Sequence, residues 1–395
     1  MEMPRTLVLS GHFPPESGGV QTFTWELVRR LPADRVVVVA PASPGAADFD
    51  AGLEFPVVRR RGYLLFRGLR RLVARQGTEA AWITAVAPFG LYAPLVRAAG
   101  VRRLVGSTHG QELGWFRAPP TRAALRAVVR SFDVVTHLSA GTLPELQEAV
   151  RDRTRLVQLA GAVDTGRFRP GLDGAQVRRR HGLGRGPVVL SVARLVRRKG
   201  HDVLLRAWGD VVRRHPDARL VIVGDGPMRR RLAELAAQAP PGTVTLAGPI
   251  TPADLPYYYA AADVFTLPCR DDRCGLQTEG LGLSVLEASA TGVPVVVGRS
   301  GGSPEALMDG RTGLLVDAGG PDELALALHR LLADPGRAAA MGAAGRAWAR
   351  ERWSWDAAAV RLAALLSGND RPSGTPLGAR RRTPWMEPVW PSRSS

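Results

Sequence analysis

Short, almost entirely apolar runs alternate with stretches of helical periodicity through the first part of the chain. Apolar residues recur at helical spacing between these runs, as at Val20, Phe23, Leu27 and Leu31 and within 121–130. We expect strands at TLVLS (6–10), RVVVVA (35–40), AAWITAV (80–86), RRLVGST (102–108), DVVTHLS (133–139) and RLVQLAG (155–161). Strands that are apolar on both faces and separated by helices indicate a parallel sheet covered on both sides.

This alternation stops at DTGRFRPGLDG (164–174), which is rich in Gly and Pro and has the character of a linker. It then restarts, and a second set of elements follows. We expect strands at 187–193, 218–224, 243–248, 263–268 and 294–298, and helices at 201–213, 227–238, from Pro252, 282–290, 321–333, 335–351 and from Ser354. The pattern predicts an α/β protein with two Rossmann-like, doubly wound parallel-sheet domains that face each other across a cleft.

The length of 395 residues suits two domains with some chain left over. We expect the first domain over 1–170, the second over 171–350 and a terminal helix over 351–367. Residues 368–395 are rich in Pro, Ser and Arg and have no period, so we expect a disordered tail. The tail's arginines and tryptophans leave contact with a membrane or a partner as the alternative to an inert tail.

No run reaches the roughly 20 uncharged apolar residues of a membrane span, and the first residues do not resemble a signal peptide. We therefore expect a cytoplasmic protein. Its two cysteines, Cys269 and Cys274, fit reduced thiols better than a disulfide framework. No Cys and His residues show zinc-ligand spacing, so we expect no metal site.

The formal net charge of +17 raises the question of nucleic acid or anionic lipid as a partner. The arginines are spread over nearly every surface segment, and no RNA-binding module with stacked aromatics is visible, so we expect no nucleic-acid partner. Lys199 is the only lysine in the chain. A protein that otherwise uses arginine for positive charge has a need at this position for a compact ammonium group.

One segment, 57–77, interleaves arginines with Leu64, Leu65, Phe66, Leu69 and Leu72. A helix on an anionic membrane surface has this composition, and an ordinary surface helix with one buried face has it too. The sequence leaves both interpretations open.

Ligands of open parallel sheets bind beyond the carboxyl ends of the strands, so the loops that follow strands are the candidate site. The first such loop contains Gly18 and Gly19, whose small size lets backbone N–H groups at a helix N-terminus approach a phosphate. A plain flexible turn would look the same. Another loop places His109 directly after a strand, where a structural hydrogen bond and a catalytic role are both open.

The loop SVARLVRRKGHD (191–202) holds Arg194 and Lys199 across a turn that Gly200 closes. Two cations held over a loop can grip a diphosphate from two sides. We expect the neighbouring Arg197 and Arg198 to be solvated.

The stretch TEGLGLSVLEASATGVPVV (278–296) contains Glu279 and, eight residues later, Glu287. On a helix this spacing corresponds to about 12 Å, roughly the distance between the sugar and the ribose of a nucleotide diphosphate sugar. One carboxylate could hold sugar hydroxyls and the other ribose hydroxyls. The backbone amides of the residues between them, Gly282, Leu283 and Ser284, would face the phosphates.

These motifs together resemble the retaining glycosyltransferases of family GT4, which have the GT-B fold, and within it the actinobacterial phosphatidylinositol mannoside mannosyltransferases. The resemblance covers residues 5–366. It rests on FPPESGGVQTF, STHGQELGW, GAVDTGRFRP, VARLVRRKGHD, VGDGP, AGPIT and EGLGLSVLEA with its two glutamates separated by seven residues.

The resemblance implies an N-terminal acceptor domain, a C-terminal donor domain and a last helix that packs back on the N-terminal domain. It places Gly19 at the donor diphosphate, His109 at the sugar near the transfer point, and Gly248 to Ile250 at the base. Arg194 and Lys199 would neutralise the departing diphosphate, Glu279 would hold the sugar and Glu287 the ribose. Family members act with retention, without a metal and without a cofactor, since the nucleotide sugar is a substrate.

The donor implied by this resemblance is GDP-mannose, although the residues themselves leave the hexose and the base open. Members of the group carry Asn-Asp before the FPP motif, where this chain has Gly11 and His12. Acceptors approach that loop, so the acceptor is left open between a phosphoinositide glycolipid and another lipid or glycan. A peripheral contact with the inner face of the cell membrane would follow from a lipid acceptor.

Other functions on such domains are a nucleotide-sugar epimerase or a hydrolase, which would act on the donor without an acceptor. A Rossmann dehydrogenase is disfavoured, because no G-x-G-x-x-G motif follows the first strand.

Overall fold

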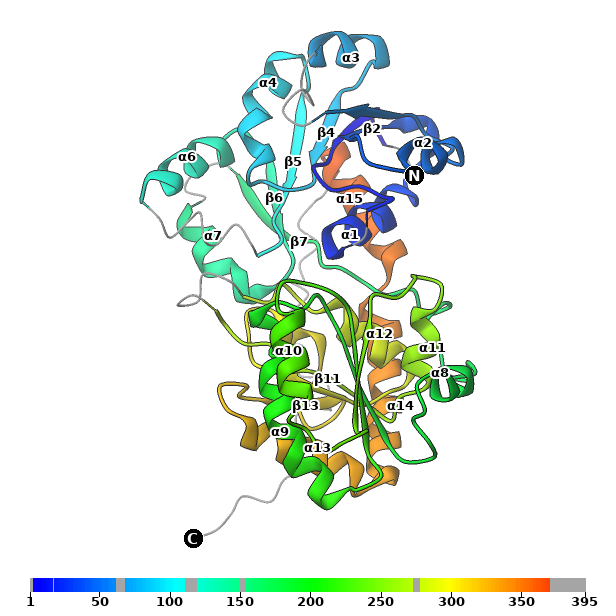
Figure 1. Cartoon of the computed structure of the whole chain (residues 1–395). Coiled ribbons are helices and arrows are strands. Elements are labelled where there is room, and N and C mark those ends of the chain that lie inside the picture. Colours follow the sequence, from blue (N-terminus) through cyan, green and yellow to red (C-terminus); the bar gives the residue numbers. More distant parts are fainter. Residues whose placement is uncertain are drawn as a thin grey trace.

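The computed structural model describes residues 3–16, 18–61, 68–110, 119–149, 154–272 and 278–369. Two parallel sheets organise it, one of seven strands in the order β3-β2-β1-β4-β5-β6-β7 and one of six in the order β10-β9-β8-β11-β12-β13. Figure 1 shows the two sheets with their helices as two bodies stacked one above the other. The expected pair of parallel-sheet units is therefore confirmed.

The strands of the first sheet are β1 (Thr6–Leu9), β2 (Val36–Pro41), β3 (Val57–Arg60), β4 (Ala80–Ile83), β5 (Arg103–Ser107), β6 (Val134–His137) and β7 (Arg155–Gln158). Those of the second are β8 (Val188–Val192), β9 (Arg219–Val223), β10 (Val244–Gly248), β11 (Val264–Leu267), β12 (Val295–Gly298) and β13 (Gly313–Val316). The strands β1, β4, β11 and β12 are buried along their whole length, which explains why they read as continuous apolar runs.

Helices connect the strands on both faces of each sheet. The first unit contains α1 (Gly19–Val28), α2 (Ala46–Ala51), α3 (Leu69–Gln76), α4 (Ala93–Ala98), α6 (Pro119–Val129) and α7 (Leu143–Ala149). The second contains α8 (Ala175–Arg180), α9 (His201–Arg214), α10 (Arg229–Ala236), α11 (Leu255–Ala260), α12 (Leu283–Thr291), α13 (Pro321–Leu332) and α14 (Pro335–Arg352), and α15 (Trp355–Ser367) follows. Short 3-10 turns lie at Ala33–Arg35, Phe89–Tyr92, Ala140–Thr142, Arg197–Lys199 and Ser303–Ala306.

The interpretation of 57–77 as one amphipathic helix is wrong. Val57–Arg60 is strand β3, paired in parallel with β2, and the helix α3 begins only at Leu69. Arg59 is not a surface charge, because its guanidinium pairs with Asp50 at 2.7 Å and donates to the carbonyl oxygens of Pro14 and Pro41. Leu64, Leu65 and Phe66 lie outside the described residues.

The last helix, α15, packs against α1, β4 and β5 of the first unit, although α14 before it packs on α12 of the second. Figure 1 shows α15 beside α1 in the upper body. Ser354 caps α15, since its side chain accepts a hydrogen bond from the Ala357 N–H, and Gly368 closes it with a φ of 72°. Residues 370–395 lie outside the described part of the chain, so the expected disordered tail is not tested.

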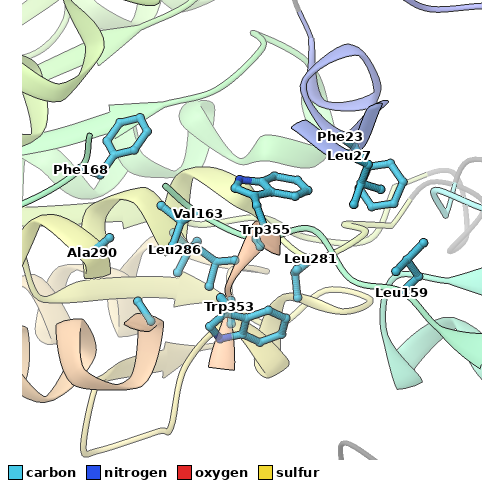
Figure 2. Packing of buried hydrophobic residues seen from close by; sticks show 14 of the residues in the cluster. Phe23, Leu27, Leu159, Val163, Phe168, Leu281, Leu286, Ala290, Trp353 and Trp355 are labelled. Carbon is cyan, nitrogen blue, oxygen red and sulfur yellow. The ribbon is translucent and has the colours of Figure 1, made fainter. Parts of the chain in front are cut away.

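One apolar cluster runs continuously from the first unit to the second. Figure 2 shows Phe23 and Leu27 of α1 close to Trp355, with Trp353, Leu281 and Leu286 continuing the cluster toward the second unit. The two units are therefore joined by buried apolar surface. No helix in the described ranges is both long enough and apolar enough to span a membrane.

Strand order reverses beside β1 and β4 in the first sheet and beside β8 and β11 in the second. Ligands of such sheets bind outside the carboxyl ends of the strands at these reversal points. The loops that leave β1, β8 and β11, which carry most of the candidate residues, lie at these points.

Candidate active site

The loop after β8 ends in a tight turn that requires a glycine. Gly200 has a φ of 72°, and a Cβ placed on it would lie 1.8 Å from the carbonyl oxygen of Pro268. This close approach brings the 3-10 turn Arg197–Lys199 against the loop that follows β11. The sole lysine is therefore held beside residues from a different crossover of the sheet.

Lys199 and Arg198 both bind the carboxylate of Glu279. The Lys199 Nζ lies 2.6 Å from Glu279 Oε2, and Arg198 Nη1 donates to the same oxygen at 2.8 Å. Glu279 is 7% exposed. Burial raises the pKa of Glu279, but Lys199 and Arg198 outweigh it, so this pKa lies below its ordinary value. The carboxylate is therefore ionised at neutral pH.

The expectation that Arg198 is solvated is wrong, because Glu279 binds its guanidinium. Arg197 does reach the surface, with a 70% exposed side chain that pairs with Asp272 at 3.2 Å. Arg194 is exposed and forms no ion pair with any residue that the structure describes. Its exposed guanidinium is therefore accessible to an incoming anion.

The helical spacing proposed for Glu279 and Glu287 is also wrong. Helix α12 begins at Leu283, and Glu279 lies before it in a loop. The backbone N–H of Glu279 donates to Ser300 Oγ at 3.1 Å, and its carbonyl accepts from the Gly302 N–H at 2.8 Å. Three-dimensional contacts with the loop after β12, and not a helical rise, thus set the position of Glu279.

The N-terminus of α12 starts at Gly282, which has a φ of 91°. Leu283 and Ser284, the first helical residues, are half-buried. A Cβ on Gly161 of the first unit would lie 2.6 Å from Leu283 Cδ2. The start of α12, whose free N–H groups favour an anion, therefore lies directly against the other unit.

Glu287 on α12 has a buried tyrosine as its partner. The hydroxyl of Tyr259 donates to Glu287 Oε2 at 2.7 Å. Burial raises the pKa of Glu287 to about 7, against smaller lowering effects of this hydrogen bond and of Arg167. With this pKa, the carboxyl group of Glu287 is partly protonated at neutral pH in the ligand-free protein. The ionised form accepts hydrogen bonds from hydroxyl groups more strongly than the protonated form does.

On the opposite side, His109 follows β5 and is buried. Its Nε2 lies 2.5 Å from the carbonyl oxygen of Thr84, and its ring meets that of Phe23 on α1 edge to face at 5.2 Å. Burial lowers the pKa of His109 to about 4, so its imidazole is neutral at pH 7. A Cβ on Gly280 would lie 3.0 Å from the His109 carbonyl oxygen, so this backbone touches the Glu279 loop.

Gly18 and Gly19 begin α1, with Gly18 as its extended N-cap. Both residues are exposed, and a Cβ on Gly19 would have no heavy atom within 4 Å. The start of α1 therefore leaves space beside Gly19, as the phosphate-binding hypothesis requires.

Gly248 ends β10 with a φ of 73°, and its carbonyl accepts from the Gly224 N–H at 2.9 Å. The nearest side-chain atom to a Cβ on Gly248 would be the Arg229 guanidinium at 3.9 Å. Ile250, two residues on, is half-buried against the apolar cluster. This segment lies one strand beyond β9, at the carboxyl edge of the second sheet.

The loops after β6 and β12 close the contact between the two units. A Cβ on Gly141 would lie 2.5 Å from the Gly301 carbonyl oxygen, and the Gly141 N–H donates to Glu305 Oε1 at 3.2 Å. Gln158 donates to the other oxygen of Glu305 at 3.0 Å. The carboxyl edges of both sheets therefore meet around the Glu279 loop.

Sequence reasoning missed Arg198, Tyr259, Ser300 and Thr84. The run Tyr257–Tyr259 in an otherwise small-residue segment was the only signal for a hydroxyl near Glu287. Thr84 acts through its backbone carbonyl oxygen, and the Ser300 hydroxyl oxygen accepts from a backbone N–H; the sequence carries no signal for either contact. Cys269 is a buried free thiol, and burial raises its pKa to about 12, while Cys274 lies outside the described residues. Within the described ranges, no three His, Cys, Asp or Glu side chains are grouped to hold a metal ion.

Comparison with solved structures identifies the architecture. HepE of Anabaena, in complex with UDP and glucose, superposes with a TM-score of 0.77 at 20% identity, covering 92% of this chain and 99% of that one. Sucrose-phosphate synthase of Thermosynechococcus elongatus superposes with a TM-score of 0.75 at 22% identity, covering 91% and 98%. The fold is that of the GT-B glycosyltransferases.

Two family profiles match, "Glycosyltransferase Family 4" over residues 17–167 and "Glycosyl transferases group 1" over residues 175–348. A Mycolicibacterium smegmatis protein named GDP-mannose-dependent alpha-(1-6)-phosphatidylinositol monomannoside mannosyltransferase is 44% identical, covering 92% of this chain and 98% of that protein. The Corynebacterium glutamicum protein named as the corresponding enzyme for the monoacylated monomannoside is 36% identical, covering 93% and 99%. The chain belongs to glycosyltransferase family 4.

Proposed function

We propose that the chain transfers a mannosyl group from GDP-mannose to a hydroxyl of a phosphatidylinositol mannoside. The support is the 44% identity, over nearly the whole of both chains, to a protein named for this donor and this acceptor. A nucleotide-sugar epimerase or hydrolase on the same fold is not favoured by these relatives.

The chemistry of the site supports a reaction in which protein groups meet the charge of the leaving diphosphate. In this proposal Arg194, Lys199 and the N–H groups at the start of α12 stabilise negative charge that grows as the donor's C1–O bond breaks. The acceptor oxygen forms its bond to C1 on the same face, and its proton passes to an oxygen of the departing phosphate. Glu279 holds the sugar, Glu287 the ribose, and Gly248 to Ile250 the base.

The proposal therefore includes retention of anomeric configuration and independence of metals and cofactors. The test is transfer by the purified chain from GDP-mannose, with UDP-glucose as the control donor and phosphatidylinositol monomannoside as acceptor. We expect an α-linked product by NMR and the same rate with and without EDTA. A β-linked product would reject retention, and loss of activity with EDTA that Mg²⁺ restores would reject metal independence. Donor turnover without acceptor would favour the epimerase or hydrolase.

A lipid acceptor requires the enzyme to reach a membrane, and one face of the first unit suits this. Helix α3 turns Leu69 and Val73 inward and exposes Arg70, Arg71 and Arg75. The adjacent segment exposes Leu91 by 50% and Leu95 by 55%. Figure 1 shows α3 and α4 side by side at the end of the upper body. We propose that this face binds peripherally to the inner, anionic face of the cell membrane.

Sedimentation with anionic vesicles tests this contact. We expect the chain to sediment with vesicles that contain phosphatidylinositol at physiological salt, and the Leu91→Ser/Leu95→Ser variant to stay in the supernatant. Leu326→Ser is the control, because Leu326 is 42% exposed on α13 in the second unit. Equal sedimentation of both variants would exclude this face as the membrane contact.

A further inference from the structure

Two adjacent arginines in one 3-10 turn have different environments. Arg197 has a side chain that is 70% exposed, and its partner Asp272 belongs to the loop after β11. The side chain of Arg198 is 22% exposed, and its guanidinium reaches the buried Glu279. The backbone carbonyl of Arg198 also accepts from the Arg270 N–H at 2.8 Å, and the Arg270 side chain is held by both oxygens of Asp202 at 3.0 and 2.9 Å. Arg198 is therefore anchored on both its backbone and its side chain.

The positive charge beside Glu279 exceeds the negative charge of its carboxylate. One carboxylate faces two cations, so the cluster of Arg198, Lys199 and Glu279 carries a net charge of about +1 at neutral pH. Both cations contact Oε2, and Oε1 receives no hydrogen bond from any residue that the structure describes. One oxygen of Glu279 is thus available to a ligand while the other is held by the protein.

The ammonium of Lys199 carries three N–H donors, so it can offer donors to an arriving diphosphate besides the one that meets Glu279. A buried carboxylate that loses its counterion is strongly destabilised, because desolvation is no longer offset. The guanidinium of an arginine stays charged at any accessible pH and keeps a fixed geometry, whereas the ammonium of a lysine rotates on a flexible stem. The two cations are therefore suited to different tasks.

Building on the donor site proposed above, we propose that Arg198 is a positioning residue, the permanent counterion that holds Glu279 and thereby leaves the charge of Lys199 for the donor diphosphate. Arg198 does not touch the donor in this arrangement. It acts through Glu279, whose free oxygen meets the sugar, and through Lys199, which it releases from neutralising that carboxylate.

The test compares Arg198→Gln with Arg197→Gln, a matched loss of one charge in the same turn. We expect kcat/KM with GDP-mannose to fall about 10- to 100-fold in Arg198→Gln, the value of one charge-assisted hydrogen bond. The acid limb of the pH profile should move to higher pH, because Glu279 then has one cation instead of two. Arg197→Gln should keep the wild-type rate and profile, and Arg198→Lys should recover part of the loss.

A double-variant cycle separates this role from a structural one. If Arg198 acts through Glu279, adding Arg198→Gln to the Glu279→Gln variant should cause little further loss of kcat/KM. The single and the double variant should then unfold at similar temperatures. Additive losses in the cycle, or an unshifted pH profile, would overturn the proposal. If Arg198→Gln does not fold, Arg198→Lys decides, since a profile and rate identical to those of wild type at every pH would show that the guanidinium geometry has no role.

A failure of the proposed function can be distinguished from a failure of this inference. If wild-type protein shows no transfer from GDP-mannose, calorimetry with GDP and UDP replaces the rate. We then expect Arg198→Gln, but not Arg197→Gln, to bind the preferred nucleotide diphosphate about tenfold or more weakly, by the same argument. Equal affinity of the two variants would reject the role of Arg198 whatever sugar the enzyme transfers.

Discussion

Single residues with unusual chemistry could be found from the sequence, but their partners could not. The solitary Lys199 and the glutamates of the 278–296 stretch are visible in the chain itself. That Lys199 binds Glu279 depends on how the loops after β8 and β11 approach each other. Positions 197 and 198 are both arginine, so the residue type does not tell them apart. Only the direction in which each side chain leaves the 3-10 turn decides which one is buried. The sequence carries no signal for such a direction.

Lys199→Ala should lower turnover by about 100-fold or more, in the range seen when one donor to a developing oxyanion is removed. The physical reason is that Lys199 supplies charge to the leaving diphosphate. Steady-state kinetics with GDP-mannose measures the loss. Arg213→Ala is the control, since the Arg213 side chain is 73% exposed on α9. A purified, folded Lys199→Ala protein with near-normal turnover would contradict the phosphate role.

The raised pKa of Glu287 predicts pH-dependent donor binding. The pKa of this carboxyl group has its ordinary value of 4.5 in the unfolded chain, and burial raises it to about 7 in the ligand-free fold. Because the folded pKa is the higher one, this group makes folding less favourable as pH rises from about 4.5 to about 7. Donor hydroxyls favour the ionised form, so GDP-mannose should bind more tightly at pH 8 than at pH 6.

Calorimetry with GDP-mannose at the two pH values checks this prediction. Glu287→Gln should bind more weakly at pH 8 and should show less dependence on pH, while its turnover at saturation changes less. The control for the rest of the site is wild-type protein in the same buffers. Unchanged affinity of Glu287→Gln for GDP-mannose would show that Glu287 does not hold the ribose.

At the scale of elements, the buried central strands, the long helices and the edge strands β7 and β10 were predictable, whereas the edge strands β3 and β13 were not. The core strands read as apolar runs because both of their faces are covered. The edge strand β3 has the sequence VVRR and is only half-buried, and β13 is a four-residue edge strand that the pattern did not indicate. Four residues are too few for a period of 2 to be told from a helical one, and the arginines of β3 favoured a surface helix. Helix α15 begins directly after its capping residue Ser354, where the sequence predicted its start.

The start of α1 offers a test in which fold and binding can be separated. Gly19 has open space where a Cβ would lie, so Gly19→Ala should leave the melting temperature nearly unchanged. Its methyl group should nevertheless obstruct a phosphate at the helix N-terminus, and we expect weaker binding of GDP in calorimetry. The matched control is Gly209→Ala within α9, which also has open space and should raise stability by about 1 kcal/mol with no effect on binding. Equal GDP affinity in the two variants would argue against phosphate binding at α1.

At the scale of the whole molecule, the repeated strand and helix alternation indicated two units, but the way they meet was not predictable. Part of the contact is a close approach of backbone atoms at glycines, such as Gly141 against Gly301 and Gly280 against the His109 carbonyl, which has no side-chain signature. The apolar cluster in Figure 2 draws Trp355, Phe23 and Leu281 from segments far apart in the chain. The active site therefore depends on packing that only the assembled fold defines.

This packing predicts that α15 stabilises the first unit through one large side chain. Trp355 is 4% exposed, and its ring meets that of Phe23 edge to face at 6.1 Å, while Val360 on the same helix is 56% exposed. Trp355→Ala should lower the free energy of unfolding by about 3–5 kcal/mol, the usual cost of removing a buried aromatic side chain. Val360→Ala should change it by less than about 0.5 kcal/mol. Urea denaturation followed by circular dichroism measures both.

Because Phe23 also contacts His109, Trp355→Ala should lose transfer activity at urea concentrations where Val360→Ala is still active. Matching denaturation curves for the two variants would mean that α15 does not stabilise the first unit through Trp355.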